Sequence, residues 1–289
     1  SKADEIMHTT QMFLETLADM RDEGLPVPLV AIMPGLTNGP PTTMEALNEQ
    51  LEWIYQDYVR NPRFEGLWQM FEGKPLIIIL DTGILADKRG RTESAFRVPF
   101  FEWSLSRSGM TEADIDVHRQ KQGPVDESHF TVRWMSSQNQ VTRHHEFGHW
   151  SWMDGSLEPM VTYKDGKAEA ITVTPSFFAE YGWLAPEAYG RRGGWTYLES
   201  FKYALKSRPK VVMLHQWNEY HGQRKEHGHG PNNDVFLDTY SVEFSDDLEP
   251  ISPTAPGYRG VDPYGFYYLN MTRALMDIYR GNADDVTLL

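Results

Sequence analysis

Short apolar runs that stop abruptly at polar or aromatic residues recur along this chain, and they restrict its possible folds more than any other feature. The clearest is Val211-Val212-Met213-Leu214-His215-Gln216-Trp217-Asn218-Glu219-Tyr220. A near-continuous apolar run is typical of a parallel strand that is buried on both faces. Residues at the carboxyl end of such a strand point into the mouth of an α/β barrel. The run therefore predicts a parallel strand that delivers polar side chains to a cleft.

Strand-like and helical segments alternate along the chain. Helical patterns cover residues 6–21, 194–207 and 264–279, and a further helix opens at Thr42, with Glu45 in the capping-box position. The segments that read as strands are residues 29–33, 75–80, 130–135, 147–153, 170–174 and 211–217. This alternation predicts the α/β fold class with a parallel sheet.

The number of strands bears on the architecture. The expected fold is a (β/α)₈ TIM barrel, which needs about eight strands, two more than the sequence offers. The first residues already read as a helix. We therefore expect the first two strands of the barrel to be missing from this chain, or to be supplied by another segment. The length of 289 residues suits a single barrel domain over residues 1–289.

Composition narrows the class of protein. The formal net charge of −14 argues against a nucleic-acid partner, because phosphate binding needs a basic face. No run approaches the roughly 18 apolar residues of a membrane span. The absence of cysteine excludes disulfides, cysteine-ligated zinc and thiol nucleophiles, and it fits either the cytoplasm or the cell envelope. We expect a secreted or periplasmic protein.

The segment after Glu219 carries a family resemblance. An acidic Leu248-Glu249-Pro250 element follows, and then an aromatic-rich run that begins Tyr264-Gly265-Phe266-Tyr267-Tyr268. A strand ending in Trp-Asn-Glu, a Leu-Glu-Pro loop and an aromatic closing helix resemble the terminal barrel segment of bacterial glycoside hydrolases related to families 71 and 99. The resemblance is strong over residues 205–281. It implies a glycosidase that acts on a polysaccharide or complex glycan, with Glu219 as a catalytic carboxylate.

Glycoside hydrolysis usually needs two carboxyl groups, one as acid and one as base or nucleophile. Family 99 enzymes carry a second Glu three positions after the first, whereas this chain has Gly222 there. The candidates for the second carboxylate are Asp154 and Asp81, which both follow predicted strands; Glu146 lies deeper along its strand. No organic cofactor is expected, since the usual Gly-rich phosphate loop is missing.

Aromatic residues make up 13% of the chain, and several tryptophans lie beside polar residues at strand ends. Flat aromatic faces stack on the C–H faces of sugar rings. Trp53 and Trp68 lie in amphipathic helical context and are expected in the core. The residues expected to bind an oligosaccharide or polysaccharide are Trp134, His149, Trp152, His215, Trp217, Asn218 and Tyr220.

Two other functions compete with this interpretation. The run His145-Glu146-Phe147-Gly148-His149 matches the H-E-x-x-H motif of zinc metallopeptidases. That site needs a helix, but apolar and polar residues alternate here up to Asp154, as in a strand, where the two histidines would lie about 13 Å apart. We therefore expect no metal. The other alternative is a non-catalytic carbohydrate-binding protein, which would use the same tryptophans without paired carboxylates.

Overall fold

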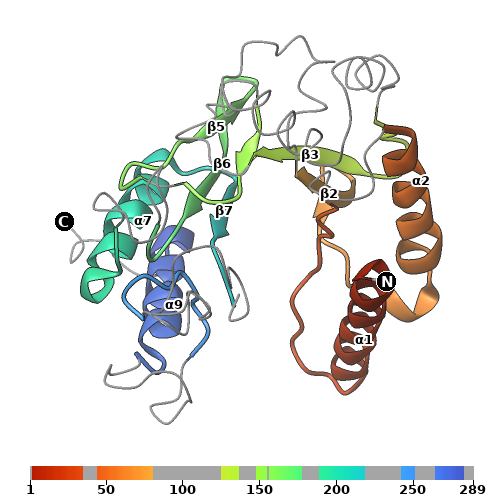
Figure 1. The fold of residues 1–289 in the computed structure, drawn as a ribbon, viewed down its shortest axis with the longest axis horizontal. Coiled ribbons are helices and arrows are strands. Elements are labelled where there is room, and N and C mark those ends of the chain that lie inside the picture. Colours follow the sequence, from red (N-terminus) through yellow and green to blue (C-terminus); the bar gives the residue numbers. More distant parts are fainter. Residues whose placement is uncertain are drawn as a thin grey trace, which may run out of the picture. The chain divides into compact units, whose positions relative to one another are not determined.

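The computed structural model describes residues 2–34, 44–80, 125–136, 148–154, 156–177, 189–218, 242–250 and 264–282 (Figure 1). The chain divides into two compact units, Ser1–Met135 and Ser136–Leu289. Each unit combines strands with helices, which confirms the α/β class. The single barrel domain over residues 1–289 stays a prediction.

The first unit contains helices followed by a short mixed sheet. Its elements are α1 (Lys2–Asp22), α2 (Met44–Ile54), the π-helix η1 (Tyr55–Val59), the 3₁₀ turn η2 (Pro62–Phe64), β1 (Met70–Phe71), β2 (Lys74–Leu80) and β3 (Thr131–Ser136). β2 and β3 are parallel, from the pair Leu76–Thr131 to the pair Leu80–Met135. β1 pairs with β2 in an antiparallel hairpin. The parallel pairing of the predicted strands at 75–80 and 130–135 is confirmed.

The predicted strand at residues 29–33 forms only single bridges. Val30 pairs in parallel with Trp68, and Ile32 pairs in parallel with Ile77. The segment therefore changes partner within two residues, so neither pairing continues into a ladder. The cap expected at Thr42 lies outside the described residues, whereas Glu45 stands in the first turn of α2 as predicted.

Apolar residues from every layer of the first unit meet in one core. α1 contributes Leu14 and Leu17, and β2 contributes Ile77 and Ile79. Leu76 and Ile78, on the other face of β2, are buried as well, as expected for a parallel strand covered on both sides. The core predictions for the tryptophans are confirmed: Trp68 is buried in this cluster and Trp53 packs against it.

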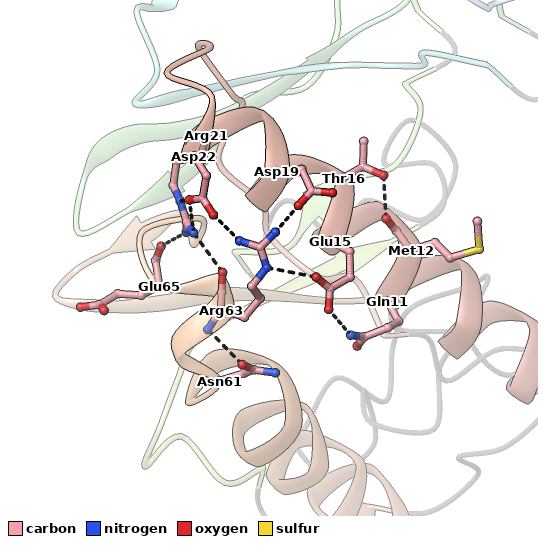
Figure 2. A network of polar contacts seen from close by, with 10 residues as sticks. All are labelled: Gln11, Met12, Glu15, Thr16, Asp19, Arg21, Asp22, Asn61, Arg63 and Glu65. Carbon is pink, nitrogen blue, oxygen red and sulfur yellow. Dashed lines mark hydrogen bonds and ion pairs between the residues drawn. The ribbon is translucent and has the colours of Figure 1, made fainter.

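Arg63 joins η2 to the last turns of α1 through its guanidinium group (Figure 2). The group donates to Glu15 at 3.2 Å and also to Asp19 and Asp22. Arg21, on α1, donates in return to the carbonyl oxygens of Arg63 and Glu65. Hydrogen bonds from Arg21 and Arg63 lower the pKa of Asp22 below its usual value. These charges are partly or largely exposed, so each pair adds little stability by itself.

The second unit contains a β-hairpin, a parallel strand and two helices that pack on them. Its elements are β4 (Trp150–Ser151), β5 (Thr162–Lys164), β6 (Lys167–Val173), the 3₁₀ turn η4 (Arg192–Gly194), α7 (Trp195–Ser207), β7 (Val211–Leu214) and α9 (Tyr267–Arg280). β6 and β7 are parallel, from Ala170–Val211 to Val173–Leu214. Because α7 lies between them in the chain, the three elements form the βαβ connection that the alternating pattern predicted.

Three strands of this unit differ from the prediction. β7 ends at Leu214 instead of residue 217, and its four residues are half-buried, whereas a strand buried on both faces was expected. β4 is shorter than the expected strand at residues 147–153, of which Phe147 lies outside the described residues. Gly148 has a φ of +82°, a left-handed conformation that interrupts extended backbone ahead of β4. β5 was not predicted, although Asp165-Gly166 between β5 and β6 is a typical hairpin turn.

The core of the second unit lies between the parallel strands and the helices. Ile171 and Val173 from β6 pack against α7 and α9, which lie beside the sheet in Figure 1. The buried helix residues in this cluster are Tyr197, Phe201, Ala204, Tyr268 and Leu275. Both predicted helices, at 194–207 and 264–279, are confirmed within a few residues. This packing fixes β6 and β7, whose carboxyl ends carry the candidate site.

Candidate active site

The carboxyl ends of β4, β6 and β7 lie at the same edge of the second unit. The main-chain N–H of His215, directly after β7, donates to Val173 at the end of β6. The Trp150 indole donates to Glu169 and Thr172 donates to the Ser151 carbonyl, so the contacts advance in the same direction along β4 and β6. Residues that follow these strands are therefore neighbours in space.

Trp152, directly after β4, meets His215 at this edge. The two ring centres lie 5.1 Å apart with their planes at 70°, an edge-to-face contact. Trp152 is half-buried, whereas Trp217 is 52% exposed. The sequence placed all three residues at strand ends, and the structure brings Trp152 and His215 together. Aromatic side chains with open faces at such an edge can stack on a sugar ring.

Residues 242–250 return to the carboxyl end of β7 and extend it by hydrogen bonds. The carbonyl of Gln216 accepts from Leu248 N at 2.9 Å, and the carbonyl of Trp217 accepts from Glu249 N at 2.9 Å. Farther out, the Asn218 amide donates to Glu249 Oε2 at 2.7 Å. The Trp-Asn and Leu-Glu-Pro elements, recognised separately in the sequence, are thus bonded to each other.

A buried acid–histidine pair lies beneath these contacts. His215 Nε2 lies 2.8 Å from Asp246 Oδ2, and the two residues are 5% and 1% exposed. Gln216 binds the same aspartate twice, through its side-chain amide at 3.2 Å and its main-chain N–H at 3.1 Å. The negative charge of a carboxylate this close to Nε2 stabilises a proton on that nitrogen. Sequence reasoning missed Asp246, because only the returning loop identifies its partner.

Arg191 contacts the same returning segment, residues 242–250, and is 1% exposed. Its Nε donates to the Ser245 carbonyl at 2.6 Å, and its Nη2 donates to Ser245 Oγ at 3.0 Å and to the Asp247 carbonyl at 2.5 Å. The sequence gives no reason to choose Arg191 over Arg192, because a stretch such as Arg191-Arg192-Gly193 has the composition of an ordinary exposed loop.

Other predicted site residues lie among packed or turn-forming groups. Asp154 is 1% exposed, and its Oδ2 accepts a hydrogen bond from the Met160 N–H at 2.6 Å. This bond closes the loop between the two residues. His149 is buried, and its carbonyl accepts from Thr162. Trp134 is buried in the core of the first unit, the position typical of a packing side chain. The roles predicted for these residues stay predictions.

The remaining predicted residues fall outside the described part of the chain. They are Glu219, Asp81, Tyr220 and the His145-Glu146 half of the H-E-x-x-H run. Within the described ranges, no three His, Asp or Glu side chains form a group that could hold a metal. In the same ranges, no helix is long and apolar enough to cross a membrane.

Comparison with known proteins gives a fold but no family. No protein-family model matches the chain, and no curated protein matches it. Among solved structures, the chain is similar to the GH99 endo-alpha-mannosidase from Bacteroides thetaiotaomicron. One structure of that enzyme, in complex with bis-tris-propane, matches at 14% identity with a TM-score of 0.50, over 92% of this chain and 73% of that chain. A second structure matches at 15% identity with a TM-score of 0.50, over 94% and 70%.

These neighbours are TIM barrels, so the α/β chain has a fold similar to that of glycoside hydrolase family 99. The described strands supply parallel pairs of the kind that such a barrel contains, β2 with β3 and β6 with β7. A complete barrel does not appear among the described residues.

Proposed function

We propose that this chain is a glycoside hydrolase that cleaves glycosidic bonds in a polysaccharide or complex glycan, within a (β/α)₈ barrel fold. One observation carries the proposal. At the carboxyl edge of parallel strands, in a fold similar to that of endo-alpha-mannosidases, the chain gathers Trp152, His215 and the Asn218–Glu249 pair. Active sites of α/β barrels lie at this edge.

The described residues suit the binding of a sugar. The exposed Trp217 offers a stacking face, and Asn218 offers amide and carbonyl groups to hydroxyls. Glu249 holds the Asn218 side chain, which restricts its orientation before any ligand binds. We assign Tyr220 to the same cleft from its place in the sequence.

Glu219 directly follows Asn218 and is the proposed catalytic carboxylate. For the second carboxylate we retain Asp154 and Asp81. Glu249 becomes a third candidate, because its bond to Asn218 brings a half-buried carboxylate beside the residue that precedes Glu219. The separation of the two groups decides whether configuration at the anomeric carbon is retained or inverted.

The proposal is tested with Glu219→Gln, assayed on a panel of mannans and complex glycans that the wild-type protein cleaves. The substitution preserves volume and removes the carboxylate, so turnover should fall at least about 10²–10⁴-fold, the range of acid–base catalysis alone. Glu23→Gln, on an exposed position of the first unit, is the matched control and should leave turnover unchanged. Wild-type turnover by Glu219→Gln would refute the assignment.

Single substitutions at Asp81, Asp154 and Glu249 identify the second carboxylate, because only the true partner of Glu219 should show a comparable loss. Asp154→Asn should also lower stability, because Asp154 holds the Met160 N–H, so thermal unfolding is measured beside activity. If all three variants turn over normally, a two-carboxylate mechanism involving these residues is wrong.

The two competing functions give different results. A zinc peptidase would hold stoichiometric zinc and lose activity with chelators, whereas we expect neither. A carbohydrate-binding protein would bind the same glycans without cleaving them, and Glu219→Gln would then change no measured rate.

A further inference from the structure

Arg191 is a buried cation whose side-chain hydrogen bonds, within the described part of the chain, all go to one short segment, residues 245–247. Its guanidinium group donates to the carbonyls of Ser245 and Asp247, which flank Asp246 on both sides, and also to Ser245 Oγ. The Asp246 carboxylate itself is turned to His215 and Gln216. Arg191 therefore holds the main chain immediately before and after the residue that contacts the histidine.

The charge of Arg191 is compensated without an ion pair among the described residues. Its guanidinium carbon lies 4.4 Å from the centre of the Tyr268 ring and 5.4 Å from that of Tyr264. Carbonyl dipoles and aromatic faces both stabilise a cation that has lost its water. A buried cation is costly unless its donors are satisfied. Since three donated bonds go to residues 245–247, holding that segment is the main consequence of placing an arginine here.

The position of residues 245–247 determines which ring nitrogen His215 offers to a ligand. The Asp246 carboxylate at 2.8 Å favours a proton on Nε2, which leaves Nδ1 of the neutral ring as a hydrogen-bond acceptor. Trp152 packs edge-to-face on the same ring and limits its rotation. If residues 245–247 shift, Asp246 shifts with them, and the position of the proton on the ring is no longer fixed.

We propose that Arg191 is a positioning residue, which acts through Asp246 to keep His215 in the Nε2–H form with Nδ1 free to accept from a substrate hydroxyl. The tautomer part follows from the contacts above and stands without any enzyme activity. The ligand part rests on the proposed function.

The tautomer is read by NMR of protein carrying ¹⁵N-labelled histidine, at mildly alkaline pH, with His215→Gln used to assign the resonances. Wild-type His215 should show a single Nε2–H form. Arg191→Lys keeps the positive charge but removes the planar guanidinium group that donates several hydrogen bonds at once. The ¹⁵N signals of His215 should therefore shift toward those of a mixture of tautomers. Arg192→Lys, at the exposed neighbouring position, is the matched control and should match the wild type.

Ser245→Ala provides a second, milder variant in case Arg191→Lys does not fold. It removes the bonds that Ser245 Oγ accepts from Arg191 at 3.0 Å and from Asp247 N at 3.3 Å, and it keeps both carbonyl bonds to Arg191, so it should give a smaller shift in the same direction. An unchanged His215 spectrum in a folded Arg191→Lys protein, or in Ser245→Ala when Arg191→Lys does not fold, would overturn the proposal.

Activity distinguishes this inference from the proposed function. If the wild type cleaves a glycan, Arg191→Lys should raise KM up to about tenfold, as expected for one weakened hydrogen bond, with a smaller change in kcat. If no glycan is cleaved, the proposed function fails, while the His215 spectra still decide the tautomer. Altered spectra with unchanged KM would reject the ligand part alone.

Discussion

Gly190 lies against the side chain of Glu243, and replacing it with alanine should force the two apart. A Cβ atom at residue 190 would lie 2.3 Å from Glu243 Oε1, 2.7 Å from its Cγ and 2.8 Å from its Cδ, all below ordinary contact distance. The glutamate must swing away and release the Arg192 N–H, which it accepts at 2.8 Å. Overpacking costs about 1–3 kcal/mol and a lost hydrogen bond about 0.5–1.5 kcal/mol. We therefore expect Gly190→Ala to lower the free energy of unfolding by about 2–4 kcal/mol.

A double-mutant cycle isolates this contact. In a Glu243→Ala background the obstructing side chain is gone, so Gly190→Ala should cost less than about 1 kcal/mol or even stabilise the protein, by restricting the unfolded chain. Urea unfolding of the four proteins gives the coupling energy between the two positions, which should reach about 1–3 kcal/mol. If the two substitutions are additive within about 0.5 kcal/mol, the proposed clash does not determine the cost.

Three further outcomes test the packing and the surface charges. Phe201→Ala leaves a cavity at a fully buried position on α7 and should lower the free energy of unfolding, measured with a chemical denaturant, by about 3–5 kcal/mol. Lys206→Ala, at an exposed position of the same helix, is the control and should lower it by about 0.5 kcal/mol or less. Equal losses would contradict the place of Phe201 in the core. Trp217→Ala should raise KM, or weaken glycan binding measured by calorimetry. The unfolding temperature should change little, because the Trp217 side chain is 52% exposed. A large drop in unfolding temperature would show that Trp217 stabilises the fold by packing against neighbouring side chains. The pKa of Asp22 is lowered in the folded state, so the stability that its carboxylate contributes is present above the unfolded pKa near 3.8 and is lost as the pH falls through the lowered folded pKa. The difference in the free energy of unfolding between wild type and Arg63→Met should therefore shrink in acid. A difference that does not change with pH would contradict the Arg63 network.

Local pattern was enough to predict most of the secondary structure. The strands at 75–80, 130–135 and 170–174 and the start of the strand at 211 are rich in apolar and β-branched or aromatic residues, and each appears with its parallel partner. The helices at 194–207 and 264–279 followed from spacing alone. The strand predictions were wrong where a single residue interrupts the extended backbone, as the left-handed Gly148 does, or where a segment changes its pairing partner within two residues, as at Val30 and Ile32.

The sequence by itself determined that aromatic and polar side chains would follow strand ends, since the boundary between an apolar run and its polar end is a local property. Trp152 and His215 meet as a consequence, because parallel strands bring their carboxyl ends to one edge. The partners of those residues were decided only in three dimensions. Arg191 binds Ser245 across 54 positions of the chain, and Asp246 reaches His215 only because residues 242–250 fold back onto β7. Hydrogen bonds between distant segments depend on the path that the chain between them takes. The residue pattern near either partner contains no information about that path, so these bonds cannot be predicted locally.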